Sequence, residues 1–228
     1  KGEEGVLVVS AGKNIALAGA ALTALGKNGS VLLSAGENIS LDTKKLQSEK
    51  DMTANAENYL RTKRSTELGT EIRADGNISM TAGNDLTARA ATIESKSGTA
   101  SHAAGNDISL TEGRETAEDH YGIRYKSSGL LSSTTTTVRT NAEADAAITS
   151  KVTGQNVSIT AKRDASFTAA DIAADSDVNI AAGRNFSAVS AENYSHTENY
   201  KEVKKSGIFS SGGFGFTIGT KQTKTTPA

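Results

Sequence analysis

A short motif of the form Gly-x-Asn-apolar-small-apolar recurs along the chain and constrains its fold more than any other feature. Within each copy, apolar side chains alternate with Ser, Ala or Asn, which is the two-residue period of a β-strand with one buried face. Copies and variants begin at Gly12, Gly36, Asp75, Gly105, Gly154 and Asp175. We expect tight structural corners at the polar residues Asn14, Asn38, Asn77, Asp107, Asn156, Asp177 and Asn185.

A second strand-like unit starts eight residues after three of these positions (77 to 85, 156 to 164, 177 to 185). Apolar Ile93 and Ile172 follow two of these units after eight more residues, so the repeat has three short strands. Whole copies are offset by 21 residues (156 to 177) or 22 (85 to 107), which is too short for a βαβ unit of about 30 residues. Copies that stack like on like about 4.8 Å apart would form a continuous core. We therefore predict an all-β fold, a right-handed parallel β-helix that is a solenoid of about 21-residue coils.

The residues before each strand suit a tight corner. Glycine adopts positive φ without strain, and Asn or Asp visits that region more readily than other residues. Side chains of stacked corner residues can also form ladders between coils. An antiparallel β-sandwich has alternating strands and frequent turns too, and it stays the alternative, although it does not require a fixed 21-residue offset.

Two stretches interrupt the coil rhythm, at about 113–150 and about 192–228, and they resemble each other. The segment from Lys126 to Ser133 matches the segment from Lys204 to Ser211 at an offset of 78 residues. Each continues into an alternating strand, so we predict extrahelical β-hairpin arms on a single β-helical domain spanning 1–228. A similar tyrosine-bearing run at 56–59 is interpreted as a degenerate copy. The remaining roughly 150 residues give about seven coils at about 21 residues each.

Composition excludes several function classes. The formal net charge of −1 gives no electrostatic case for nucleic acid as a partner. The chain has no cysteine, which excludes a disulfide framework and thiolate metal sites. No 18-residue apolar run or signal-peptide pattern occurs, so we expect any targeting information to lie in a longer parent chain.

No residue pattern indicates catalysis, a cofactor or a metal. His102, His120 and His196 have no metal-ligand spacing, and we expect structural or surface roles for them. A small acidic group, Asp171 and Asp175 with the corner residue Asp177, lacks the glycine-rich pattern of calcium-binding repeats. The candidate interaction arm is an apolar cluster in a chain with 4% aromatic residues, formed by Ile208, Phe209, Phe214, Phe216 and Ile218. We interpret it as a contact for a membrane, a partner strand or a host surface, or as packing against the helix.

The Ala-Gly-x-Asn-Ile repeats, together with the glycine-rich stretch at 205–219, resemble the haemagglutinin repeat region of filamentous haemagglutinin-type exoproteins of two-partner secretion. The first arm departs from this pattern, because it has four threonines at 134–137 where the second arm has glycine and phenylalanine. The resemblance implies a segment of a secreted, outer-membrane-associated filament on the bacterial cell surface. Its implied partners are neighbouring repeats, an outer-membrane transporter during secretion, and a target-cell or host surface.

The resemblance leaves two functions open. One is the stalk or toxin-delivery region of a contact-dependent growth inhibition effector, and the other is a host-cell adhesin segment that binds glycan or protein. A polysaccharide lyase is a remote third reading, because parallel β-helices often carry such enzymes. Outward coil positions would then need converging charged residues, but they are Ser40, Ser79, Ser109, Ser158 and Asn179.

Overall fold

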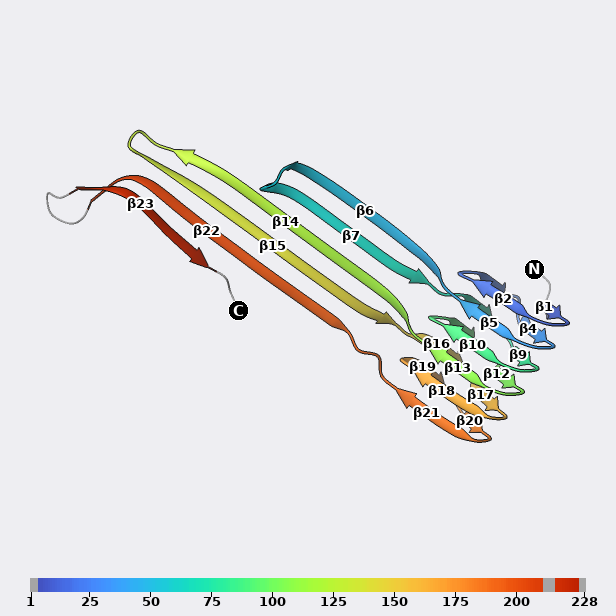
Figure 1. The fold of residues 1–228 in the computed structure, drawn as a ribbon. Coiled ribbons are helices and arrows are strands. Elements are labelled where there is room, and N and C mark those ends of the chain that lie inside the picture. The colour runs from blue at the N-terminus through green and yellow to red at the C-terminus, as the bar shows by residue number, and fades with distance from the viewer. Residues whose placement is uncertain (1–3, 211–215, 226–228) are drawn as a thin grey trace. The chain divides into compact units, whose positions relative to one another are not determined.

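The structure, a computed structural model, describes residues 4–210 and 216–225, and every regular element in this part of the chain is a β-strand (Figure 1). The chain divides into two compact units, which we describe separately. The coil unit contains residues 1–46, 66–115 and 146–192. The arm unit contains residues 47–65, 116–145 and 193–228.

Three parallel sheets form the coil unit. The first contains β1 (Val6–Ala11), β4 (Ser30–Ala35), β9 (Ile78–Ala82), β12 (Thr99–Ala104), β17 (Asn156–Ala161) and β20 (Val178–Ala182). The second contains β2 (Ile15–Ala18), β5 (Ile39–Asp42), β10 (Leu86–Arg89), β13 (Ile108–Thr111), β18 (Asp164–Thr168) and β21 (Asn185–Val189). The third contains β3 (Ala21–Ala24), β8 (Glu71–Ala74), β11 (Thr92–Ser95), β16 (Ser150–Gly154) and β19 (Ala170–Ala174).

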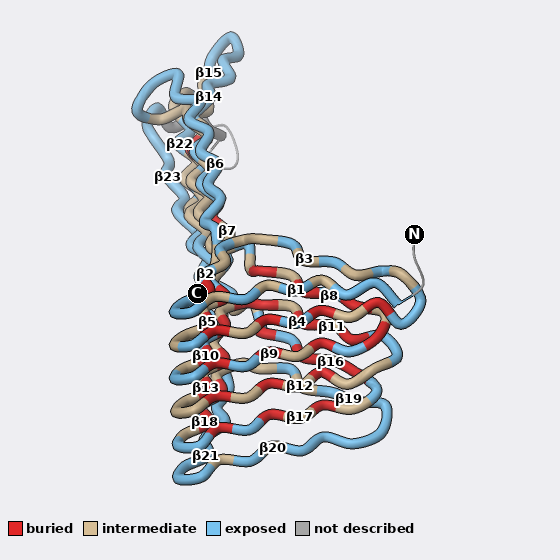
Figure 2. Tube along the Cα trace, turned by 90° about the vertical axis from the view of Figure 1, so that its right-hand side faces the viewer, coloured by how far each residue is buried: buried red, intermediate tan, exposed pale blue. Residues whose placement is uncertain are grey.

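The chain visits the three sheets in turn and stacks each coil on the one before it, as Figure 2 shows. Neighbouring strands within these sheets are parallel, which confirms the predicted parallel β-helix and excludes the antiparallel sandwich. The described residues form six coils, the last with two strands, whereas about seven were expected. Val157 pairs with Val178 at an offset of 21 residues. Ala100 pairs with Ile78 at 22, and Val6 with Ser30 at 24, so the coil length varies.

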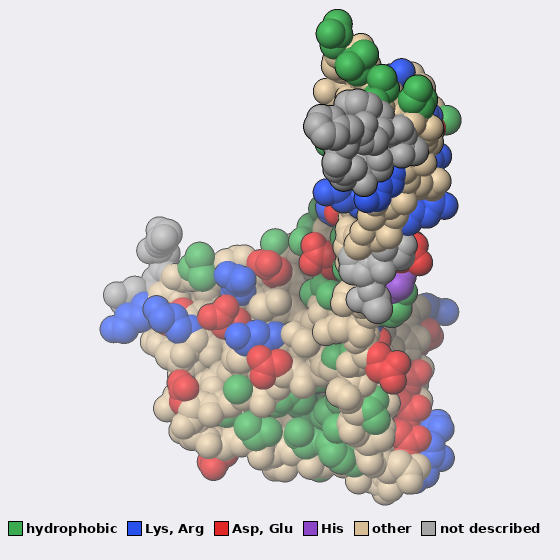
Figure 3. Space-filling view, turned by 90° about the vertical axis from the view of Figure 1, so that its left-hand side faces the viewer, with side chains coloured by type: hydrophobic (Ala, Val, Ile, Leu, Met, Phe, Trp, Pro, Cys, Tyr) green, Lys and Arg blue, Asp and Glu red, His purple; other side chains and the backbone are tan. Residues whose placement is uncertain are grey.

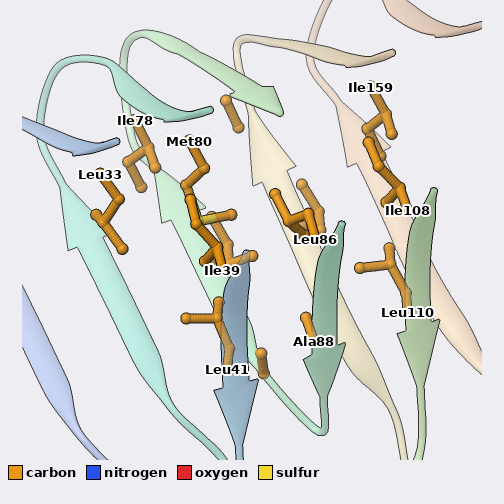
Figure 4. Packing of buried hydrophobic residues seen from close by; sticks show 14 of the residues in the cluster. Leu33, Ile39, Leu41, Ile78, Met80, Leu86, Ala88, Ile108, Leu110 and Ile159 are labelled. Atoms are coloured by element: carbon orange, nitrogen blue, oxygen red, sulfur yellow. The ribbon is translucent and has the colours of Figure 1, made fainter. Parts of the chain in front are cut away.

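Stacked aliphatic side chains from all three sheets fill the interior of the coil unit. Figure 4 labels members of this core from the first and second sheets. Leu33, Met80 and Ile159 lie in one inward ladder of the first sheet, and each is fully buried. Ile39 and Leu86 form the equivalent ladder in the second sheet. Because alternate residues point inward, the short strands of the inner coils contribute two or three side chains each to this core, whereas β21 of the last coil is exposed along its length.

The glycines of the repeated motif lie where successive coils approach most closely. A Cβ atom added at Gly36 would lie 2.2 Å from the carbonyl oxygen of Gly12, and one added at Gly83 would lie 2.0 Å from that of Gly36. A Cβ atom added at Gly105 would lie 1.9 Å from the carbonyl oxygen of Gly83. None of these residues has positive φ. The corner therefore requires glycine because of close backbone stacking, and the expected positive φ was wrong.

The arm unit is a six-stranded sheet of three hairpins with the order β23-β22-β15-β14-β7-β6. Its strands are β6 (Lys44–Asn55), β7 (Asn58–Leu68), β14 (Gly113–Ser128), β15 (Ser132–Ile148), β22 (Tyr194–Ser210) and β23 (Phe216–Thr225). The hairpin β6–β7 was anticipated only as a degenerate copy at 56–59, because β6 is exposed along its whole length and carries no apolar alternation. The predicted arms at 113–150 and 192–228 contain the other two hairpins.

Each arm leaves the coil after its strand in the second sheet, in the second, fourth and sixth coils. Two coils advance a β-helix by about 9.6 Å, twice the strand spacing of about 4.8 Å. A hairpin occupies two strand spacings in its own sheet, which is the same length. One hairpin for every two coils therefore lets adjacent hairpins pair as strands of one sheet.

Candidate functional site

One ladder of polar side chains follows the corner between the first and second sheets. The side-chain oxygen of Asn14 accepts a hydrogen bond from the backbone N–H of Asn38 at 3.0 Å. The pattern repeats from coil to coil, so that each side chain binds the backbone of the next coil. In each further pair, a backbone N–H donates to the side-chain oxygen of the residue in the coil before. These pairs are Asp85 N–H to Asn38 (3.2 Å), Asp107 N–H to Asp85 (3.2 Å), Asp164 N–H to Asp107 (3.0 Å) and Asn185 N–H to Asp164 (3.1 Å).

The remaining corner residues lie at a different corner, before the first sheet. Asn77 accepts a hydrogen bond from the backbone N–H of Thr99 at 2.8 Å, and Asn156 accepts one from that of Asp177 at 3.3 Å. The backbone N–H of Asn77 itself donates to the hydroxyl of Ser30 at 3.1 Å. The same sequence motif therefore occurs at two different corners of the coil, because each corner needs a short side chain that accepts a hydrogen bond before a strand begins.

Arginine residues partly neutralise the stacked carboxylates of the first ladder. The Arg184 guanidinium hydrogen-bonds to Asp164, with Nε 2.9 Å from Oδ1, and lowers the pKa of that carboxyl to about 2. Arg163 lies 3.7 Å from Asp107 in the coil before. The ladder carboxylates thus have structural partners in the backbone and in neighbouring arginines.

The three histidines lie in separate environments. His102 is buried in the core between Met80 and Ile159 of the adjacent coils. His120 lies 3.1 Å from the side-chain oxygen of Asn141, and His196 lies beside a glutamate on β22. Among the described residues, no group of three or more His, Asp or Glu side chains is placed to hold a metal ion. In the same part of the chain, no helix is long and apolar enough to span a membrane.

Ion pairs join the first and second hairpins of the arm unit. Nη2 of Arg64 donates to both carboxylate oxygens of Asp119, at 2.9 and 2.7 Å. Arg124 binds both carboxylate oxygens of Glu57 at 2.6 Å. These side chains are roughly half exposed, so solvent screens each pair strongly, and the pairs mainly fix the register of the two hairpins.

The candidate interaction arm is described only in part. Phe214 lies outside the described residues, and the side chains of Phe209 and Phe216 also lie outside them, although their backbones pair within β22 and β23. Ile208 lies directly opposite Ile218, and both side chains are exposed. Leu130 and Leu131, which no sequence pattern marked, lie in the exposed turn between β14 and β15.

Comparison with known families matches the chain to the family described as Hemagglutinin repeat, over residues 53–130 and 131–226. The boundary between the two matched repeats falls at the turn between β14 and β15. Each matched repeat therefore begins in one hairpin, continues through about two coils of the β-helix and ends in the next hairpin. No solved structure matches the chain.

Curated relatives are large proteins of which this chain covers a small part. The chain is 35% identical over 154 residues to the 16S rRNA endonuclease CdiA of Enterobacter cloacae subsp. cloacae, covering 68% of the chain and 5% of that protein. It is 33% identical over 120 residues to a tRNA nuclease CdiA of Escherichia coli (strain STEC_O31), covering 53% and 4%. It is 33% identical over 164 residues to the deoxyribonuclease CdiA of Dickeya dadantii, covering 71% and 5%.

The chain spans about a twentieth of the length of these relatives. Its three-sheet coil, its hairpin arms and two matched repeats agree on one assignment. The chain belongs to the haemagglutinin repeat family found in CdiA exoproteins.

Proposed function

We propose that this chain is a stalk and delivery segment of a contact-dependent growth inhibition exoprotein, and that it has no catalytic activity of its own. The observation that carries the proposal is the range of activities among its relatives. Their names give a 16S rRNA endonuclease, a tRNA nuclease and a deoxyribonuclease, yet each contains a segment similar to this chain. A segment shared by proteins with different nucleic-acid substrates serves a step that is common to all of them.

The coil unit suits the role of a spacer. Its core is a continuous stack of buried aliphatic side chains, and its outward positions on the second sheet carry a row of hydroxyl side chains, for example Ser40, Thr87 and Ser109 in register. Hydroxyl rows do not supply the acid and base groups that polysaccharide lyases need. On the third sheet, the outward Glu71 and Glu94 both pair with Arg73, at 3.5 and 3.7 Å, so these charged groups neutralise one another. Together these features support a structural role over the lyase reading.

The proposed cellular location and partners are those of the same family. The segment lies in an exoprotein secreted through an outer-membrane transporter partner, stays associated with the outer membrane of the producing cell, and faces the target cell. Neighbouring repeats of the parent chain continue its coil at both ends. Phe186, on the last coil, lies in register with buried Ala165 yet is 56% exposed, and such a continuation would cover it.

Deleting residues 1–228 from the parent exoprotein tests the delivery function in cells. We expect producing cells to display the shortened exoprotein, measured with an antibody against another region, and to lose inhibition of target cells. The toxin expressed inside the target should stay active. Full inhibition by the deletion variant would refute the proposal. Loss of attachment between the two cells, measured by microscopy, would favour the adhesin alternative.

A further inference from the structure

The hairpins of the arm unit join one another through a single type of contact. In the strand order β23-β22-β15-β14-β7-β6, the second strand of one hairpin lies beside the first strand of the next, β7 beside β14 and β15 beside β22. The contact between β15 and β22 is antiparallel over fourteen residue pairs, from Ser132 opposite Gly207 to Asp145 opposite Tyr194. Backbone pairing along whole strands therefore holds neighbouring hairpins together.

Strand β6 is the first strand of its hairpin and lacks this contact. It is the outermost strand of the arm sheet, and among the described residues only β7 pairs with it. Alternate residues of an antiparallel strand turn their N–H and C=O groups away from the partner, so about half of the backbone groups of Lys44–Asn55 point outward from the sheet. All side chains of this strand are exposed as well, as Figure 2 shows.

The length of β6 argues that its open edge has a partner in the longer protein. Edge strands of natural sheets are usually short, or they carry a proline or several lysines that discourage pairing with another strand. Strand β6 has 12 residues, whereas about 5–6 is common, and it contains no proline. Its lysines are interleaved with Glu49 and Asp51, so β6 can pair with a strand that carries charges of both signs.

Adjacent charges on β6 resemble those at the contact between the first and second hairpins. That contact has two ion pairs, Lys63 with Glu118 at 3.3 Å and Arg64 with Asp119 at 2.7 Å. Because successive side chains point to opposite faces, each face of the sheet has one pair. Glu49 and Lys50 are likewise adjacent, and no ion pair joins either of them to another described residue. Figure 3 shows Lys and Arg side chains gathered at the surface of the arm unit.

We infer that β6 pairs with the second strand of a hairpin from the preceding repeat of the parent chain, so that the arm sheet continues from repeat to repeat. In both contacts between hairpins, a first strand accepts the second strand of the hairpin before it, and β6 is a first strand. Further hairpins are available, since the family repeat matches this chain twice and the matched part is only 5% of the Enterobacter cloacae relative. The added strand carries a cation opposite Glu49 and an anion opposite Lys50. The inference rests on the proposed function, because it takes this chain as one segment of such an exoprotein.

Hydrogen–deuterium exchange read by mass spectrometry tests this inference on two chains. One is residues 1–228, and the other is the same segment extended by the preceding repeat of its parent. We expect the peptide that covers β6 to exchange at least about tenfold more slowly in the extended chain, because a second ladder closes its open edge. Strand β14 is paired on both sides in either chain, so its exchange rates should agree within about twofold. Equal exchange of β6 in the two chains would overturn the inference.

Two variants of the extended chain identify the strand that covers β6. Deleting the hairpin of the preceding repeat while keeping its coils should return β6 to the exchange rate of the shorter chain. Protection that survives this deletion would assign the edge to another partner and overturn the inference. Protection of β6 in the shorter chain that grows with protein concentration would do the same, because a second copy would then occupy the edge.

Reversing the charges on β6 tests the pairing without removing any backbone. Glu49→Lys with Lys50→Glu keeps the net charge but places like charges opposite one another, so exchange of β6 in the extended chain should be about threefold to tenfold faster. The matched control, Lys151→Glu with Asp171→Lys, makes the same reversal at exposed positions of the coil unit and should change this rate less than about twofold. Equal effects of the two reversals would contradict the charge pairing.

The cellular deletion and the exchange measurement fail separately. A segment whose β6 is protected by the preceding repeat but which is dispensable for target inhibition contradicts the proposed function and leaves the strand pairing in place. A segment that is required for inhibition but whose β6 exchanges equally in both chains contradicts only the strand pairing.

Discussion

Acid should weaken the coil unit through a single buried histidine. His102 lies on β12 with its side chain in the core, 1% exposed, between Met80 and Ile159 of the neighbouring coils. Neither ring nitrogen has a hydrogen-bond partner. Burial lowers the pKa of His102 from 6.5 to about 4, and the nearby Ser101 backbone opposes this shift only in part. The folded coil therefore holds the neutral imidazole.

Whether acid raises or lowers the free energy of unfolding depends on which state, folded or unfolded, binds the proton first. Between pH 6.5 and about 4 the unfolded chain takes up a proton that the folded chain refuses, so the free energy of unfolding falls as the pH falls. The difference between the pKa of His102 in the unfolded and folded chain corresponds to about 3 kcal/mol of unfolding free energy. Below pH 4 both states are protonated and this loss stops. Asp164, whose pKa is lowered to about 2, contributes its change only below pH 3.8.

Replacing His102 with methionine should remove this dependence, because methionine has a similar volume and no titrating group. Urea unfolding followed by circular dichroism at several pH values between 7.5 and 4 measures both chains. We expect the His102→Met variant to lose the slope between pH 6.5 and 4. At pH 7 it should be more stable than the parent chain by about 1–3 kcal/mol, since two unpaired buried nitrogens are removed. An equal slope in the two chains would refute the assignment of acid sensitivity to His102.

Three further predictions concern the coil contacts and the arm seam. Gly83→Ala should lower the free energy of unfolding by about 1–3 kcal/mol, because its Cβ would lie 2.0 Å from the Gly36 carbonyl oxygen. An added Cβ at Gly12 has no atom within 4 Å, so Gly12→Ala should lower the free energy of unfolding by less than about 0.5 kcal/mol in the same urea assay. Leu33→Ala should cost about 2–5 kcal/mol as a fully buried side chain, and a smaller cost than that of any exposed leucine would contradict the core assignment. Arg64→Ala should lower the free energy of unfolding far less than Leu33→Ala does, and the difference from the parent chain should disappear in 1 M salt.

Much of the fold follows from local sequence. The alternation at Val157 and Ile159 places one face of a strand inward, and the 21-residue offset to Val178 matches the strand register found between β17 and β20. The parallel arrangement was predictable for that reason, because like-on-like stacking at a fixed offset requires neighbouring strands to run in the same direction. The resemblance between the segments at Lys126 and Lys204 similarly marked two excursions from the coil.

The hairpin β6–β7 was not predictable from its own residues. All twelve residues of β6 are exposed, and its charged, polar sequence has no apolar period to identify a strand. Strand β6 is held in place by pairing with β7, and β7 lies next to β14 of the second hairpin, which begins 45 residues after β7 ends (68 to 113). The ion pair between Arg64 and Asp119 depends on the same long-range pairing.

The sequence alone determined the strand period, the approximate coil offset and the kinds of residue found at corners, because these depend on neighbours within a few residues. The tertiary structure decided which corner each residue occupies. Asn38 and Asn77 have the same local motif, yet Asn38 binds the backbone before the second sheet and Asn77 the backbone before the first. It also decided that Leu131, Ile208 and Ile218 meet in one row, since backbone pairing between separate hairpins sets that contact.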